Sequence, residues 1–152
     1  MKRKLFGMIL LGVLVLGFAG CGIKYPELKD DAIAFDMGEY IDESDEEYGT
    51  IEYNGRVYLP YGTIKNSLRS TDINECIGYI IQNEETSSIV DFDDKDTRVY
   101  TLADDPDENY LMEYYIGTTL MNQPSFWRAV DTRDSQIDTP QYIESLDYSY
   151  WK

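Results

Sequence analysis

Two clusters of acidic residues could bind a metal ion, because carboxylates that are close together in sequence can be ligands for Ca²⁺. Neither cluster has the EF-hand spacing: counted from Asp91, the fifth position is Lys95, and counted from Asp105, the sixth is Tyr110, where glycine is needed. Two interpretations stay open, an irregular Ca²⁺ site and solvated turns. We predict turns, with no metal and no cofactor. The clusters are Asp91-Phe92-Asp93-Asp94-Lys95-Asp96 and Asp104-Asp105-Pro106-Asp107-Glu108-Asn109.

The chain contains no histidine, which removes the commonest general base, the usual zinc ligand and the Ser-His and Cys-His nucleophiles. It also has no glycine-rich phosphate loop and no Gly-x-Ser-x-Gly elbow. A pair of carboxylates could hydrolyse glycosides, but with 29 acidic residues such pairs arise from composition alone. We therefore expect no enzyme and no catalytic residues, and we keep a small atypical hydrolase as an alternative.

Aromatic residues are the second group that could form a site. The chain has 14 tyrosines and two tryptophans, and these side chains are enriched at binding surfaces. We expect Tyr58, Tyr61, Tyr115 and Trp127 to lie partly exposed and to contact a ligand. The alternative is that they pack a small sheet, because aromatic residues are also favoured in strands.

The first 20 residues have the organisation of a secretory signal. The basic start Lys2-Arg3-Lys4 precedes an apolar run of 14 residues, 5–18, and then the small pair Ala19-Gly20. The run is shorter than the roughly 20 residues that span a bilayer. A cleaved signal is therefore favoured over an uncleaved membrane helix.

The order Phe18-Ala19-Gly20-Cys21 resembles the lipobox of bacterial lipoproteins, although Phe18 stands where leucine is usual. The resemblance implies cleavage between Gly20 and Cys21 and attachment of a diacylglyceryl group and an N-acyl chain to Cys21. More than one hydrocarbon chain gives stable anchoring. We therefore expect an extracytoplasmic protein that is tethered to the cell membrane or to an outer membrane.

The charge of the chain bears on its partners. The whole chain carries −16, and cleavage before Cys21 leaves ten basic and 29 acidic side chains, a net charge of −19. Such an excess disfavours nucleic acid and attracts cationic peptides or proteins over long range. The alternative is that the charge only keeps an exported domain soluble.

The sequence divides into a signal (1–20), an acidic tether (21–48) and a β-rich domain (49–152). Six of the nine residues in 39–47 are acidic, and such a block cannot bury enough apolar surface to fold. We predict that this part of the chain is extended. The alternative is that it docks a cationic ligand.

Residues 51–59 predict a hairpin turning at Asn54-Gly55. A two-residue loop pairs Tyr53 with Arg56. A three-residue loop pairs Glu52 with Arg56 and places Ile51 beside Val57 on one apolar face. Because register follows the hydrophobic face, we favour the three-residue loop.

The remaining pattern predicts one small antiparallel β domain, mainly β with one or two short helices. Alternation in 110–116 favours a sheet with one buried face, and Gly78 suggests a bulge or a close backbone approach. Cys76 is expected to be buried and inert. Strands are expected at 76–82, 98–102, 110–116 and 125–130, helices at 63–69 and after Thr139-Pro140, and a docked tail at 148–151.

These features favour a lipid-anchored extracytoplasmic binding module for a cationic peptide or protein. In its small size and acidic charge the chain is similar to the immunity lipoproteins of peptide-antibiotic producers. The alternative is a structural or accessory lipoprotein of the cell envelope, recruited to a larger assembly through its last forty residues.

Overall fold

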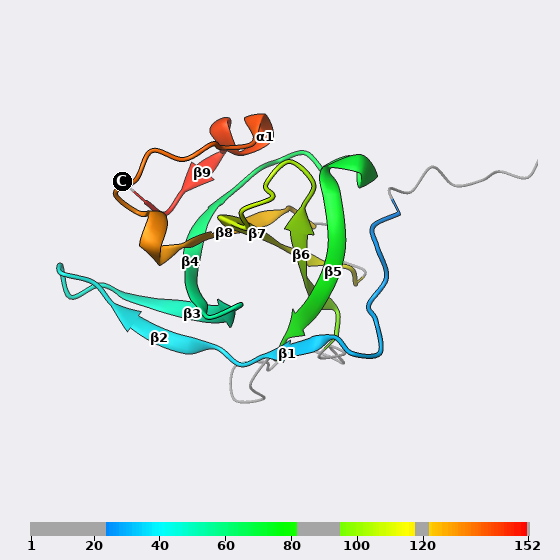
Figure 1. Ribbon diagram of the computed structural model, residues 1–152, viewed down its shortest axis with the longest axis horizontal. Helices are drawn as coiled ribbons and strands as arrows, with labels where there is room; N and C mark the ends of the chain where they lie inside the picture. The colour runs from blue at the N-terminus through cyan, green and yellow to red at the C-terminus, as the bar shows by residue number, and fades with distance from the viewer. Residues whose placement is uncertain (1–23, 82–94, 118–121, 152) are drawn as a thin grey trace, which may run out of the picture.

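Strands are the main regular secondary structure of the computed structural model, which describes residues 24–81, 95–117 and 122–151 (Figure 1). Helix in these residues is limited to α1 (Gln141–Glu144) and the 3₁₀ turns η1 (Ser70–Asp72) and η2 (Val130–Thr132). The predicted mainly β fold class with short helices is therefore confirmed. The strands are β1 (Ile33–Phe35), β2 (Gly38–Ile41), β3 (Glu47–Tyr53), β4 (Arg56–Thr63), β5 (Ile73–Ile80), β6 (Thr97–Leu102), β7 (Tyr110–Tyr115), β8 (Ser125–Ala129) and β9 (Tyr148–Ser149).

All nine strands belong to one curled sheet in the order β1-β5-β6-β7-β8-β4-β3-β2, with β9 paired to β4. The two ends of this order, β1 and β2, are separated in sequence only by Asp36 and Met37. The sheet therefore curls into a ring whose ends are joined through the chain itself (Figure 1). The sheet is mixed rather than purely antiparallel, because β1 pairs in parallel with β5.

The sheet begins well before residue 49, so the prediction of an extended tether over 21–48 is wrong for most of that range. Strands β1 and β2 lie within it, and Tyr25 already packs its ring against Tyr114, with 4.9 Å between ring centroids. The acidic block forms the turn between β2 and β3, where the Asp42 carboxylate accepts the N–H groups of Ser44 and Glu46 at 2.8 and 3.1 Å. Glu43, Asp45 and Glu46 stay exposed in this turn, whereas the Asp42 side chain is only 6 % exposed. The residues on either side of the turn pair with each other in β2 and β3.

The hairpin at Asn54-Gly55 has the two-residue loop, with Tyr53 opposite Arg56, so the favoured three-residue register is wrong. Asn54 and Gly55 have φ values of 50° and 75°, as a type I′ turn requires. The register prediction assumed that Val57 faces the core with Ile51. In the structure Tyr58 is opposite Ile51, and both are fully buried.

Apolar side chains are buried on both faces of the sheet. Inside the ring lie Phe35, Ile51, Tyr58, Ile77, Ile80, Val99, Leu111, Trp127 and Ala129. A second cluster, which includes Tyr100, Tyr110, Met112 and Phe126, is covered by residues 64–73, by α1 and by Tyr25 and Leu28. The prediction of one buried face is therefore wrong for β7, where Leu111 and Met112 are both buried.

Several local predictions are confirmed. The register of β5 shifts around Cys76 and Gly78, and a Cβ on Gly78 would clash with the carbonyl oxygen of Ile33, so the glycine permits the close approach of β1. Cys76 is buried, and burial raises the pKa of its thiol. Helix α1 follows Pro140, and the tail docks through β9. The predicted helix at 63–69 is wrong, because Thr63 ends β4 and residues 64–69 form no helix.

Candidate functional site

The four aromatic residues expected at a binding surface do not form one site. Tyr58 and Trp127 are 0 % and 4 % exposed inside the ring, so the expectation that they lie partly exposed is wrong. Tyr61 is half-buried on the outer face, with its ring 5.4 Å from that of Tyr110 and 5.3 Å from that of Trp151. Tyr115 is half-buried at the end of β7.

The polar atoms of the two buried aromatic residues are satisfied within the protein. Tyr58 donates its hydroxyl to the Glu108 carbonyl oxygen at 2.7 Å. Trp127 donates its indole N–H to the Glu113 carboxylate at 2.8 Å. Desolvation raises the pKa of Glu113, which shares the inward-facing side of β7 with Leu111. These residues stabilise the interior of the ring.

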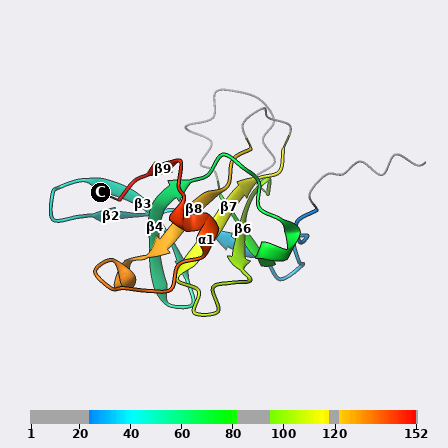
Figure 2. The same cartoon turned by 90° about the horizontal axis from the view of Figure 1, so that it is seen from above.

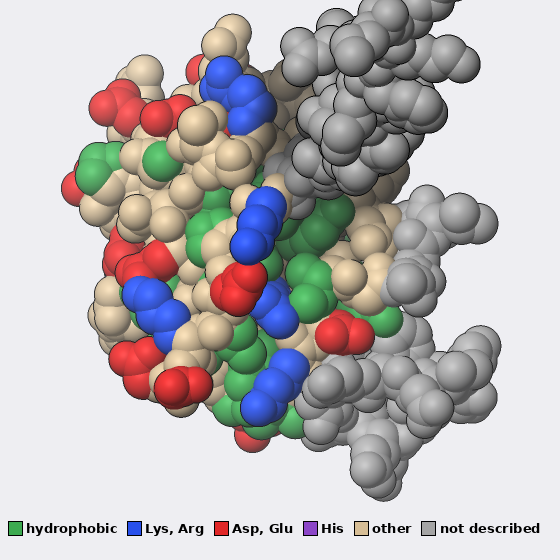
Figure 3. Space-filling model, turned by 90° about the vertical axis from the view of Figure 1, so that its right-hand side faces the viewer, with side chains coloured by type: hydrophobic (Ala, Val, Ile, Leu, Met, Phe, Trp, Pro, Cys, Tyr) green, Lys and Arg blue, Asp and Glu red, His purple; other side chains and the backbone are tan. Residues whose placement is uncertain are grey.

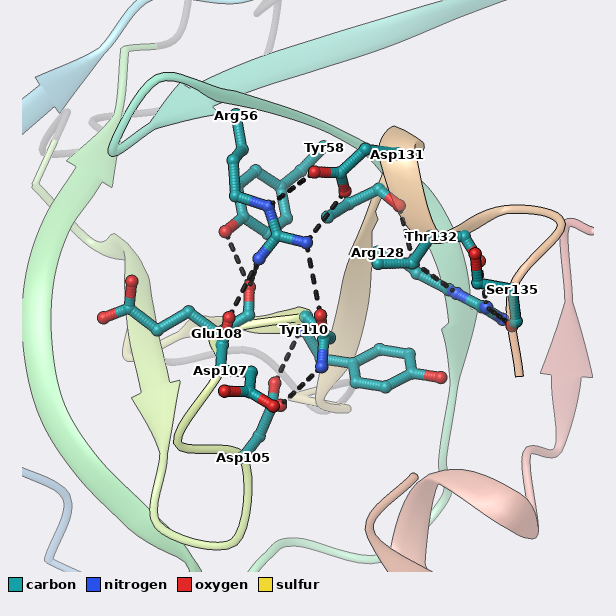
Figure 4. A network of polar contacts seen from close by, with 12 residues as sticks. Arg56, Tyr58, Asp105, Asp107, Glu108, Tyr110, Arg128, Asp131, Thr132 and Ser135 are labelled. Atoms are coloured by element: carbon teal, nitrogen blue, oxygen red, sulfur yellow. Dashed lines mark hydrogen bonds and ion pairs between the residues drawn. The ribbon is translucent and has the colours of Figure 1, made fainter. Parts of the chain in front are cut away.

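Arg56 is the centre of a network that closes one end of the ring (Figure 4). Its guanidinium donates two hydrogen bonds to the Asp131 carboxylate, at 3.0 and 2.8 Å. It also donates to the carbonyl oxygens of Asp107 and Glu108, both at 2.9 Å, and to the Asn109 side chain at 3.2 Å. These bonds join β4 to the β6–β7 loop and to η2, so Arg56 holds the fold together rather than binding a ligand.

Arg128 has a similar structural role on the outer face. Its guanidinium lies 5.4, 5.7 and 5.1 Å from the ring centroids of Tyr61, Tyr110 and Trp151. It also donates to the side chain and the carbonyl oxygen of Thr132, at 3.0 and 2.6 Å. Cation–π contacts of this kind fasten the tail to the sheet.

The acidic cluster 104–109 forms a turn, as predicted. The buried Asp105 carboxylate accepts the backbone N–H of Tyr110 at 2.6 Å, and desolvation raises the pKa of this carboxyl. No three Asp, Glu or Cys residues come close enough to hold a metal ion in the part of the chain that the structure describes. The first four residues of the other cluster, 91–94, lie outside the described residues.

The described residues form a groove of about 690 Å³. One wall is the segment from the end of β4 to η1, and the other is α1 with the residues that follow it; these two segments lie side by side in Figure 2. We call this surface the α1 groove. It is lined by Ile64, Lys65, Asn66, Ser67, Leu68, Arg69, Asp72, Asp104, Gln141, Tyr142, Ser145 and Asp147.

The α1 groove combines ion pairs with an unpaired carboxylate. Lys65 binds Asp147 at 2.9 Å, and Arg69 binds Asp72 at 2.6 Å in a contact that lowers the pKa of Asp72. Asp104 is exposed and has no ion-pair partner among the described residues. A cation that enters the groove can therefore contact Asp104 without breaking an existing pair.

Tyr142 contributes an unusual polar atom to this surface. Its hydroxyl oxygen is buried and has no hydrogen-bond partner among the described residues. Burial raises the pKa of this hydroxyl, and the negative charges of Asp104, Asp72 and Asp105 raise it further. The hydroxyl therefore stays protonated, and it lies near acidic side chains of the groove.

The face shown in Figure 3 fits a basic ligand less well. Figure 3 shows the face formed by β5 and residues 24–32, where Lys and Arg side chains lie among Asp and Glu. On this face Lys29 already binds Glu75. The mixed charge lowers the attraction that this face can exert on a cation.

Sequence reasoning missed the α1 groove because its walls are distant in the chain. Residues 64–72, Asp104 and residues 141–147 meet only through the curl of the sheet. The Thr139-Pro140 pattern predicted α1 but not the segment from the end of β4 to η1 that forms the other wall of the groove. No motif in the sequence could have found this site.

Comparison with protein-family models, with curated proteins and with solved structures finds no match to this chain. The described residues contain no helix of the length and apolarity needed to cross a membrane. The expected lipid attachment site Cys21 and the cleavage position Gly20 lie outside the described residues.

Proposed function

We propose that this chain is a lipid-anchored extracytoplasmic binding protein that captures a basic segment of a peptide or protein in the α1 groove. The observation that carries the proposal is that Asp104 lines the groove beside Tyr142 and has no ion-pair partner among the described residues. A lysine or arginine side chain can pair with this carboxylate. Asn66, Ser67, Gln141 and Ser145 supply polar groups for the main chain of the segment.

The charge of the whole protein supports the same partner. Downstream of Gly20 the chain has ten basic and 29 acidic side chains, so a cationic ligand is attracted before contact. This attraction falls with ionic strength, because exposed charges are screened beyond a Debye length of about 8 Å at physiological salt. Binding that weakens steadily with added salt is the expected behaviour.

The lipid anchor is part of the proposal and has its own test. Cells that express the wild type or Cys21→Ala are labelled with an alkyne fatty acid and then fractionated. We expect label and membrane retention in the wild type and the loss of both in Cys21→Ala. A labelled, membrane-retained Cys21→Ala protein, or an unlabelled wild type, would contradict lipidation at Cys21.

The groove is tested with a fluorescent ten-residue oligolysine peptide and the full chain in neutral detergent micelles. Asp104→Asn removes the unpaired carboxylate and should weaken binding by roughly fivefold, the effect of about 1 kcal/mol expected for an exposed charge pair. Fluorescence anisotropy at several salt concentrations measures the affinity.

Asp134→Asn is the matched control, because Asp134 is also an exposed aspartate but does not line the groove. It removes the same charge from another surface and should change the affinity by less than about twofold. Equal effects of the two variants would mean that the peptide responds to net charge alone. The groove would then not be the binding site.

A second candidate function is an accessory envelope lipoprotein that joins a larger assembly through its C-terminal residues. The observation that favours it is the exposed pair Tyr148 and Tyr150, 58 % and 45 % accessible, whose ring centroids are 5.0 Å apart. Contacts made by such rings would be largely insensitive to salt. Salt-resistant co-purification that is lost in Tyr148→Ser/Tyr150→Ser would favour this function over peptide capture.

A further inference from the structure

The outer edge of β2 is a strand edge left without a partner in the described part of the chain. Strand β2 pairs only with β3 there, and it is the last strand in the order of the sheet. In both views the β2–β3 hairpin projects away from the ring (Figures 1 and 2). The edge is therefore open to another chain.

The hydrogen-bond alternation identifies which residues of β2 face outward. The Asp42 N–H donates to the Glu46 carbonyl oxygen at 2.9 Å, so Asp42 is bonded to the opposite arm of the hairpin. Successive residues of an antiparallel strand bond alternately to the two sides. Tyr40 therefore bonds toward β3, whereas Glu39 and Ile41 present their N–H and C=O groups to the open edge.

The side chains along this edge are apolar and acidic. Met37 and Ile41 are 45 % and 64 % exposed, and Glu39 is exposed between them. Lysine, proline and bulges, which protect many open edges, are absent from β2, and its protection is limited to its length of four residues and the charge of Glu39. The edge offers both the main-chain groups and the apolar contacts that a docking strand needs.

The charge of the hairpin decides which strand can dock. Six acidic residues lie in 39–47, and the single cation paired with them in the described residues is Arg133, which is 3.6 Å from Asp42. A second copy of this hairpin would bring like charges together, which opposes pairing between copies. A strand that carries lysine or arginine would gain from the same charges.

We propose that the outer edge of β2 binds an extended basic segment of a partner protein by strand addition. The segment bonds through its main chain to Glu39 and Ile41, places apolar side chains on Met37 and Ile41, and directs basic side chains to the acidic turn. This inference rests on the proposed function for the charge of the partner, and it adds a second contact surface separate from the α1 groove.

The test uses an eight-residue peptide of alternating lysine and valine, and the full chain in neutral detergent. Glu39→Pro removes one outward N–H, and proline is tolerated at the solvent side of an edge strand. Glu39→Gln is the matched control, since it removes the same charge and keeps the N–H. We expect Glu39→Pro to weaken binding about tenfold more than Glu39→Gln, because a main-chain hydrogen bond is lost.

A second probe removes the bonding groups from the peptide instead. The same peptide with N-methyl groups on alternate residues keeps its charge but cannot form the ladder, so it should bind at least about tenfold more weakly. Circular dichroism confirms that each variant is folded. If Glu39→Pro is unfolded, Ile41→Pro removes the other outward N–H, and amide exchange of Ile41 in the wild type reports the docked strand directly.

The outcomes separate this inference from the α1 groove. Binding that is weakened by Asp104→Asn but equal in Glu39→Pro and Glu39→Gln places the peptide in the groove and overturns strand addition. Binding weakened by Glu39→Pro alone supports strand addition and contradicts the groove. Unchanged binding of the N-methylated peptide overturns strand addition in either case. A concentration-dependent dimer that is lost in Glu39→Pro would instead identify a second copy as the occupant, which overturns the basic partner.

Discussion

Replacement of Arg56 by alanine tests whether the network at the end of the ring stabilises the fold. The variant loses the Asp131 pair and the hydrogen bonds to Asp107, Glu108 and Asn109. The Arg56 side chain is 23 % exposed and that of Asp131 is 61 % exposed. Because the Asp131 side of the ion pair is open to solvent, the pair contributes less than about 1 kcal/mol.

The hydrogen bonds to the β6–β7 loop account for more of the expected loss. Each partly buried bond contributes about 1 kcal/mol net, and the oxygens that remain lose their donor. The free energy of unfolding should fall by roughly 2–3 kcal/mol in Arg56→Ala. Arg56→Lys should recover little of this, because an ammonium group lacks the planar fork that reaches Asp131 and the loop together.

Urea unfolding of the full chain, followed by circular dichroism, measures these changes. Asp131→Asn removes only the exposed partner and should cost less than about 1 kcal/mol. Lys65→Ala is a control for a solvated pair, since Lys65 is 70 % exposed beside Asp147, and it should also cost less than about 1 kcal/mol. The reasoning is refuted if Arg56→Ala costs no more than these two variants.

Three further predictions concern single side chains. Burial raises the pKa of Glu113 above its ordinary value of 4.5. The folded state therefore keeps the Glu113 proton to higher pH than the unfolded state does. The stability that this protonated group contributes is lost as pH rises from about 4.5 toward the raised pKa. Glu113→Gln keeps an acceptor for Trp127 and should gain stability relative to the wild type between pH 4.5 and pH 7 in urea unfolding; a difference that does not change with pH would contradict this. Tyr142→Phe removes the unpartnered buried hydroxyl and should raise the free energy of unfolding by about 1 kcal/mol, whereas a loss of that size would show that the hydroxyl has a partner. Gly78→Ala forces a Cβ against the Ile33 carbonyl oxygen and should lower the free energy of unfolding by about 1–3 kcal/mol. If this variant unfolds at the same temperature as the wild type, β1 shifts without strain and the prediction is wrong.

Local sequence patterns correctly predicted the elements whose conformation depends on residues adjacent in the sequence. The strand at 125–130 is β8, the bulge at Gly78 is present, and the Thr139-Pro140 signal leads into α1. Each of these rests on the conformational preference of a few adjacent residues. Such preferences act before any tertiary contact forms.

The hairpin register and the acidic segment were predicted wrongly because tertiary contacts decide them. Tyr58 was expected to lie partly exposed because tyrosine is enriched at binding surfaces, but its hydroxyl is accepted by the Glu108 carbonyl oxygen and its ring is buried. Residues 21–48 were expected to form an extended tether because of the acidic block at 39–47. In the structure Glu43, Asp45 and Glu46 stay exposed in the turn, and β3 supplies the partner strand for β2.

The sequence alone determined the mainly β class, the buried Cys76 and the acidic excess, because these follow from composition and from alternation along the chain. Only the tertiary structure decided that β1 and β2 join the ends of the curled sheet, that Tyr58 and Trp127 lie inside it, and that Asp104 faces α1. The physical reason is distance along the chain. The α1 groove and the open edge of β2 depend on which strands pair across many residues, and pairing is selected by the packing of the whole ring rather than by any local preference.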